Sequence, residues 1–153
     1  MVISTPESTG AVISYCHADR RHLERLKVHL TPFVRDKKVD YWVDTMIIPG
    51  SDWFQDIERA FASARVAILL VSADFLASKF IAENELPPLL AAAKQKKAVI
   101  LSVILSPCAI EHTEMSRYQT INPISKPLSS MNKHGKESIW AAVAVQVRDA
   151  LNY

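Results

Sequence analysis

A chain of 153 residues with 49% hydrophobic and 22% charged residues is long enough to bury a core and too apolar to be disordered. Its 18 basic and 16 acidic residues are scattered and leave a net charge of +2, which is no excess for binding nucleic acid. We therefore expect a single globular domain over residues 1–153, with residues 1–9 as a flexible N-terminus and no nucleic-acid partner.

The sequence also bears on where the protein resides. Its first residues, MVISTPE, have no basic segment ahead of a long apolar one, as a secretion signal would. The longest apolar runs, 66–71 and 98–105, are strand-sized and too short to span a membrane. Cys16 and Cys108 are too few for a disulfide framework. We expect a cytoplasmic protein with reduced cysteines, no metal site and no membrane partner.

The first half of the chain predicts two strands, each followed by a helix. The apolar segment 11–15 predicts a buried strand, and Asp19 can cap a helix that Pro32 should kink or end. In 39–44 the residues alternate as in a strand with two unlike faces, and a turn at Pro49-Gly50 leads to the next helix. The expected apolar faces are Leu23, Leu26, Leu30 and Phe33 in the first helix and Trp53, Phe54, Ile57, Ala60, Phe61 and Ala64 in the second.

The second half predicts three further strands. The apolar run 66–71 is typical of a strand covered on both faces, 98–105 predicts a fourth strand, and 118–121 a short fifth. Between them, 75–97 predicts a helix in two pieces, because Pro87-Pro88 is tolerated only in the first turn of a helix. The last helix directs Ile139, Val143, Val147 and Leu151 inward.

Strands that alternate with helices predict an α/β fold. We expect a flavodoxin-like three-layer sandwich, with a five-stranded parallel sheet of order 2-1-3-4-5 and helices on both faces. In that order a ligand binds beyond the carboxyl ends of strands 1 and 3, which are 14–15 and 72–74. The segments 44–49 and 79–86 would cover such a site.

Three blocks of sequence now point to one family: VISY at 12–15, WVDTMIIPGSDW at 42–53 and SKFIAENEL at 78–86. In this order they resemble a Toll/interleukin-1 receptor (TIR) domain, and the resemblance covers essentially the whole chain. The segment 41–53 resembles strand B and the BB loop of that family, and its Trp, Asp and Pro-Gly pattern is more similar to bacterial members than to animal receptors.

The third block resembles the helical segment that carries the glutamate with which enzymatic members cleave NAD. The chain departs from the family spacing, because Phe80 precedes Glu85 by five positions and Glu83 by three. Glu85-Leu86 keeps the glutamate-aliphatic pair, so we predict Glu85 as the catalytic residue, with Glu83 as the alternate register. The helix dipole and exposure to solvent also favour a glutamate in the first turn of a helix, so only the resemblance indicates a catalytic role for Glu85.

One carboxylate suffices for this chemistry, because the cationic nicotinamide leaves ribose as a neutral molecule and needs no general acid. We expect Tyr15, Trp53 and Phe80 to form an aromatic wall for the substrate, and Asp44 to bind ribose. The alternatives are that Trp53 and Phe80 pack in the core and that Asp44 holds its own loop. The three glycines form no phosphate-binding turn, so NAD would be a substrate, and we expect no cofactor.

The resemblance thus implies a bacterial-type NAD+ hydrolase that releases nicotinamide and ADP-ribose or a cyclic ADP-ribose. It implies immune (anti-phage) or cell-suicide signalling and activation by self-assembly with other TIR domains. The apolar residues Ile47, Ile48, Pro49 and Gly50 are the expected assembly loop. The alternative is a noncatalytic TIR adaptor, in which the same surfaces bind other TIR domains. In either case the chain can be the N-terminal domain of a longer protein.

Overall fold

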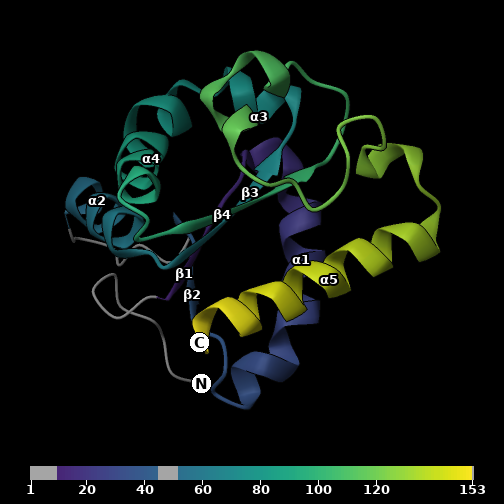
Figure 1. The fold of residues 1–153 in the computed structure, drawn as a ribbon, viewed down its shortest axis with the longest axis horizontal. Coiled ribbons are helices and arrows are strands. Elements are labelled where there is room, and N and C mark those ends of the chain that lie inside the picture. The colour runs from purple at the N-terminus through teal and green to yellow at the C-terminus, as the bar shows by residue number, and fades with distance from the viewer. Residues whose placement is uncertain (1–9, 45–51, 153) are drawn as a thin grey trace.

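The computed structural model describes residues 10–44 and 52–152, so the expected flexible N-terminus 1–9 and assembly loop 47–50 lie outside the described residues. Within the described part, four parallel strands form one sheet in the order β2-β1-β3-β4 (Figure 1). They are β1 (Ala11–Ser14), β2 (Tyr41–Trp42), β3 (Val66–Val71) and β4 (Val99–Ile104). The predicted order is confirmed for these four strands.

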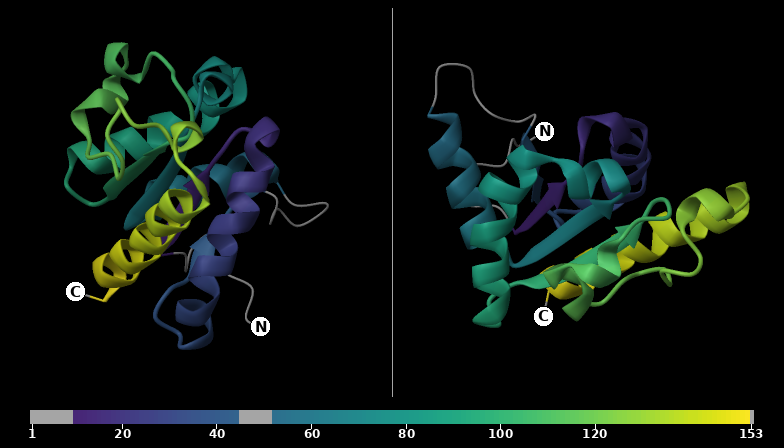
Figure 2. Two further views of the ribbon diagram at one scale, coloured as in Figure 1. Left: turned by 90° about the vertical axis from the view of Figure 1, so that its right-hand side faces the viewer. Right: turned by 90° about the horizontal axis from the view of Figure 1, so that it is seen from above.

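Helices cover both faces of this sheet. They are α1 (Arg20–Arg35), α2 (Trp53–Ser63), α3 (Ala73–Ala77), the π-helical turn η3 (Ile81–Glu85), α4 (Leu86–Lys94) and α5 (Lys133–Leu151). Short 3-10 turns are η1 (His17–Asp19), η4 (Ile110–His112), η5 (Glu114–Arg117) and η6 (Leu128–Ser130). Helices α1 and α5 pack together on one face, and α2 and α4 on the other, which gives three layers (Figures 1 and 2).

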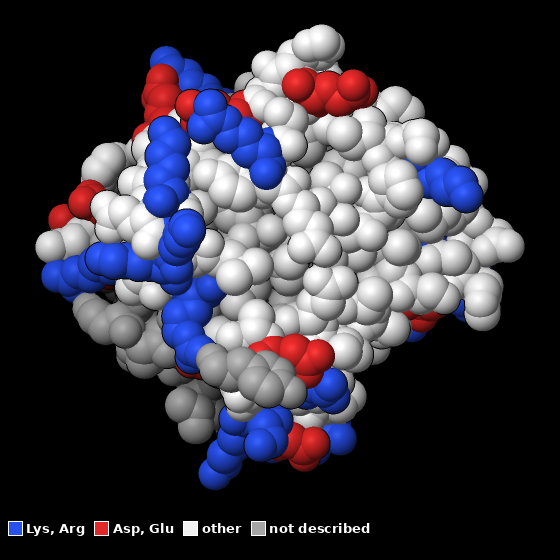
Figure 3. All heavy atoms as spheres, viewed as in Figure 1, with Lys and Arg blue, Asp and Glu red and all other residues white. Residues whose placement is uncertain are grey.

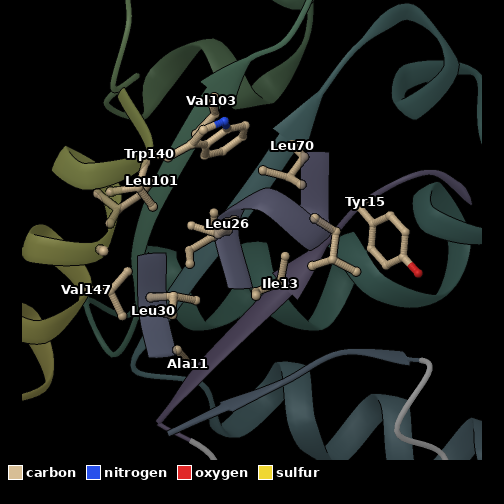
Figure 4. Packing of buried hydrophobic residues seen from close by; sticks show 14 of the residues in the cluster. Ala11, Ile13, Tyr15, Leu26, Leu30, Leu70, Leu101, Val103, Trp140 and Val147 are labelled. Atoms are coloured by element: carbon tan, nitrogen blue, oxygen red, sulfur yellow. The ribbon is translucent and has the colours of Figure 1, made fainter. Parts of the chain in front are cut away.

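The strands build two separate cores because successive side chains of a strand point to opposite faces. All six residues of β3 are buried. Val66, Ile68 and Leu70 join the core under α1 and α5, here called the α1/α5 core and shown in Figure 4. Ala67, Leu69 and Val71 join the core under α2 and α4, here called the α2/α4 core. The continuous apolar run therefore serves both layers at once.

The prediction of a fifth strand at 118–121 is wrong. This segment lies beside β4, but it makes only an isolated parallel bridge between Thr120 and Ser102. A side chain then replaces the backbone ladder: Asn122 Oδ1 accepts from the Ile104 N–H at 2.9 Å, and its Nδ2 donates to the Ile104 carbonyl at 3.0 Å. Pro123 follows and has no N–H with which to extend a strand.

Two expectations about the helices also need correction. Of the two effects expected of Pro32, a kink or an end, the end is wrong, because α1 continues through Arg35. Trp53 and Phe54 do not join the apolar face of α2, whose buried residues are Ile57, Ala60 and Phe61. These two residues are 47% and 51% exposed, and they occupy the first turn of α2. The prolines at 87 and 88 do occupy the first turn of a helix, α4, as predicted.

Charged side chains lie mainly around the rim of the face shown in Figure 3, and the middle of this face is mostly uncharged. Lys and Arg gather on its left side, where α2 and α4 lie in the same view, and acidic side chains lie among them. Among the described helices, none combines the length and the hydropathy that spanning a bilayer requires.

Asn122 gives a direct test of the sheet edge. Because Asn122 is fully buried, Asn122→Leu should leave the N–H and carbonyl of Ile104 without partners. We expect a loss of about 2–4 kcal/mol in the free energy of unfolding, measured by urea denaturation. Asn152→Ala, which removes exposed hydrogen bonds to Lys38 and Arg148, should cost less than about 1 kcal/mol. Equal losses in the two variants would contradict this account of the edge.

Candidate active site

The candidate site lies where β1 and β2 end, on the side of the sheet that α2 and α4 cover. The strand register pairs Val12 with Trp42, and both side chains belong to the α2/α4 core. Ser14 is the last residue of β1, two residues beyond Val12, so its side chain points to that side as well. Asp44 lies two residues beyond the end of β2, in the connection that follows this strand. A helical segment that packs over this edge supplies the third group, Glu85.

The backbone of η3 determines which glutamate points inward. Pro87 and Pro88 have no N–H to donate to a preceding turn, and the Leu86 N–H bonds to the Ile81 carbonyl, five residues back. This π-helical turn buries the side chains of Ile81 and Glu85. Glu83 points outward, its side chain is 60% exposed, and it lies 4.0 Å from the exposed ammonium group of Lys79. The two registers left open by the sequence therefore lie in very different surroundings.

Glu85 is held in an environment that favours its neutral form. The residue is 1% exposed, and its Oε1 accepts a hydrogen bond of 2.7 Å from the hydroxyl of Ser14. The pKa of Glu85 is raised to about 8, chiefly by burial and also by the nearby Asp44 carboxylate, whereas the Ser14 hydrogen bond opposes the rise. In this closed arrangement the Glu85 carboxyl is therefore protonated at pH 7, not the carboxylate that the chemistry above requires.

A pocket of about 600 Å³ opens beside this buried group. All four residues expected to contact substrate line it: Tyr15, Asp44, Trp53 and Phe80. Glu85 does not line the pocket, and its link to the pocket is Asp44, which lines the wall and interacts with Glu85.

The aromatic side chains of the pocket are partly solvent-exposed. The Trp53 and Phe80 rings are stacked with centroids 5.8 Å apart and an interplanar angle of 27°. Phe80 is 38% exposed, so the alternative that both rings pack in the core is wrong. Tyr15 is buried at the edge of the α1/α5 core, with its hydroxyl pointing away from the aliphatic side chains (Figure 4). Burial and then Asp44 raise the pKa of Tyr15, so its hydroxyl remains a hydrogen-bond donor.

Sequence reasoning missed several groups of this site. The further lining residues are Cys16, His17, Ser78 and Ile81, and Ser14 is the direct partner of Glu85. Ser14 had a sequence signal, since it is a polar residue at the end of an otherwise apolar strand. Within the described ranges, no cluster of three or more His, Cys, Asp or Glu side chains could hold a metal ion. The described side chains thus offer aromatic stacking, hydrogen bonding and a buried carboxyl.

The raised pKa of Glu85 predicts how stability depends on pH. Between about pH 5 and 8 the folded protein holds a proton on Glu85 that the unfolded chain has lost, so the free energy of unfolding should fall as pH rises. Glu85→Gln mimics the neutral acid and should remove this decline. At pH 8 we expect the variant to be more stable than the parent by about 2–4 kcal/mol in urea denaturation. Glu83→Gln, whose side chain is exposed, should retain the decline, and a Glu85→Gln variant that also retains it would contradict the assignment.

Comparisons with known proteins agree with this architecture. The family model described as TIR domain matches residues 12–134. An uncharacterized protein of the bacterium Sinorhizobium fredii, y4lF, is 26% identical over 133 residues. That match covers 87% of this chain and only 41% of the relative, so the chain spans less than half of the length of that protein.

Two solved structures share the fold. The TIR domain of the Toll-related receptor TRR-2 from Hydra magnipapillata has a TM-score of 0.59 and 16% identity, over 92% of this chain and 98% of that one. A metazoan TIR-STING receptor from C. gigas has a TM-score of 0.56 and 14% identity, over all of this chain and 43% of that one. Since the family model matches most of the chain and the sheet order and layers agree, the chain belongs to the TIR-domain family.

Proposed function

We propose that this TIR domain is an NAD+ hydrolase of the bacterial type, with Glu85 as its catalytic residue. The family includes both NAD-cleaving and adaptor members. The observation that carries the proposal is the placement of a buried, hydrogen-bonded carboxyl next to a pocket with an aromatic wall. A surface adaptor has no need for an acidic group in its core, where the charged form is costly. Glu83, on the exposed side of the turn, has no such setting.

The pocket residues suit a planar cationic ring. Its volume of about 600 Å³ is typical of a small-molecule site. The exposed Trp53 and Phe80 rings can stack on nicotinamide, and aromatic faces attract a positive charge. The Tyr15 hydroxyl and the Asp44 carboxylate supply polar contacts for the amide or the ribose. All four side chains line this pocket, and Asp44 also interacts with Glu85.

The reaction needs a single negative charge at the right place. When the bond between C1′ and the ring nitrogen breaks, its electron pair passes to the ring, which leaves as neutral nicotinamide. Positive charge develops on the ribose, and the ionised Glu85 carboxylate stabilises it more strongly in a buried site than in water. Water then bonds to C1′ and releases a proton, which gives ADP-ribose. Attack by a group of the same molecule gives a cyclic ADP-ribose instead.

Activation by self-assembly is part of the proposal. Glu85 is 1% exposed in the isolated domain, so substrate reaches it only after a local rearrangement. Contacts with other TIR domains through the loop 47–50 would supply that rearrangement. A domain that destroys NAD only when assembled suits an immune (anti-phage) or cell-suicide role in the bacterial cytoplasm, with NAD+ as substrate and no bound cofactor.

The two glutamates provide the decisive test. We measure nicotinamide release from NAD+ by concentrated protein with a crowding agent, to favour assembly. Glu85→Gln should reduce the rate at least about 100-fold, because the amide cannot supply the negative charge. Glu83→Gln is the matched control and should stay within about threefold of the parent, because that side chain is on the surface. Release that is lost only in Glu83→Gln would move the catalytic role to Glu83, and no release from the parent would favour the adaptor.

Neighbouring aromatic residues of α2 test the substrate wall. Trp53 lines the pocket, whereas Phe54 is equally exposed on the same turn and does not line it. Trp53→Ala should raise the KM for NAD+ about tenfold through lost stacking, with a smaller effect on kcat. Phe54→Ala should change the KM by less than about twofold. If the two substitutions act alike on the KM, ring stacking at Trp53 is not part of substrate binding.

A further inference from the structure

Two buried carboxyl oxygens at the site lack a hydrogen-bond donor. They are Oε2 of Glu85 and Oδ1 of Asp44, and neither finds a donor in ranges 10–44 and 52–152. The Asp44 carboxyl lies within hydrogen-bonding reach of Glu85. With both groups ionised, two like charges would face each other in a low-dielectric setting and leave both oxygens unsatisfied. One proton between them gives each oxygen a partner and leaves a single negative charge.

The surroundings fix the geometry of these two groups. Ser14 donates to the other oxygen of Glu85, which leaves Oε2 as the oxygen free to meet Asp44. Ser14 is the last residue of β1, and Asp44 lies two residues beyond the end of the neighbouring strand β2. Asp44 also lines the pocket, so it lies between the pocket and Glu85. It is therefore placed to influence Glu85 without lying deeper in the core.

We propose that Asp44 is a positioning residue, which forms with Glu85 a carboxyl pair that holds one proton between Asp44 Oδ1 and Glu85 Oε2. The pair sets both the orientation and the protonation of Glu85. As a role in catalysis this rests on the proposed NAD+ hydrolase function, but the pair itself is a property of the free protein. On ionisation the shared proton passes to water in the pocket, and two carboxylates remain.

Other titratable groups around the pair are few among the described residues. Tyr15 at the end of β1 interacts with both Asp44 and Glu85, and Arg20 and Glu24 of α1 act on Tyr15. Cys16 and His17 line the pocket, Glu83 of the same turn points outward, and Glu58 of α2 lines a separate surface hollow together with Glu83. The charged neighbour that acts directly on Glu85 is Asp44. Burial is the largest cause of the raised pKa of Glu85, and Asp44 is the charged group whose replacement should lower that pKa.

The test is a titration of the Glu85 side-chain carbon by carbon-13 NMR, in the whole chain and without NAD. We expect Asp44→Asn to lower the midpoint of Glu85 by at least about one pH unit, a tenfold change in proton affinity, because the like charge is gone and the amide can donate to the carboxylate. Asp44→Glu, which keeps the charge, should titrate near the parent. Ser14→Ala should raise the midpoint, since it removes a donor to the ionised form.

Matched controls make the outcome decisive. Glu83→Gln removes one negative charge from the same helical turn and should leave the Glu85 midpoint unchanged within about 0.3 pH units. Amide spectra of each variant establish that it is folded, and Ser14→Ala, with its opposite sign, tests the site if Asp44→Asn does not fold. An unmoved midpoint in folded Asp44→Asn, or shifts of the same sign for Asp44→Asn and Ser14→Ala, would overturn the proposal.

A kinetic arm separates this inference from the proposed function. In the assembled parent, kcat/KM for NAD+ should rise with pH through the midpoint found by NMR, and Asp44→Asn should move that rise to lower pH by the same amount. If the parent cleaves no NAD+ but the variants show the NMR shifts, the carboxyl pair is supported and the NAD+ hydrolase function is contradicted. If the parent is active but the pH profile of Asp44→Asn is the same as that of the parent, the hydrolase function is supported and the role of Asp44 as a positioning residue is contradicted.

Discussion

The rest of this molecule depends on the burial of one carboxyl group, that of Glu85, at the edge of an apolar sheet. An ionised carboxylate cannot remain unpaired in such a layer, because desolvation costs several kcal/mol and a domain is stable by only about 5–15 kcal/mol. The neighbourhood supplies one hydroxyl donor, from Ser14, and a second carboxyl, from Asp44. The group is therefore held in its protonated form, and a proton takes the place of a cationic partner.

The backbone imposes this burial before side-chain chemistry enters. Two consecutive prolines at the start of α4 remove donors that a regular helix would use, and the chain forms a π-helical turn in front of them. That turn directs Ile81 and Glu85 to the core and Glu83 to solvent. The same segment presents Phe80 to the pocket, where it stacks on Trp53. The burial of Glu85 and the position of Phe80 in the aromatic wall thus both follow from the π-helical turn η3.

Much of this could be predicted from the sequence, and the failures have physical reasons. Apolar periodicity located the four strands, and the two prolines correctly marked the first turn of α4. The site was expected at the ends of strands 1 and 3, and Tyr15 at the end of β1 does line the pocket, but residues 72–74 after β3 do not. The prediction of a fifth strand was wrong because the Asn122 side chain makes the hydrogen bonds to Ile104 that a strand backbone would make. Apolar periodicity does not reveal such side-chain bonds. Trp53 was assigned both to the apolar face of its helix and to the substrate wall, because periodicity alone cannot tell which apolar side chains at the start of a helix stay exposed. The choice between Glu83 and Glu85 depended on a π-helical turn, which shifts side-chain directions without changing composition.

The protonated state of Glu85 also bears on what kind of substrate this site could favour. The groups that act on this carboxyl in the described part of the chain are Ser14 and Asp44, and neither is a cation. A positive charge that enters the pocket would lower the cost of ionising Glu85, since an opposite charge within a few ångströms favours the charged form. Oxidised nicotinamide brings such a charge, whereas its reduced form is neutral. A cationic ligand in the pocket would therefore favour ionisation of Glu85, whereas a neutral molecule of the same shape would leave the carboxyl protonated.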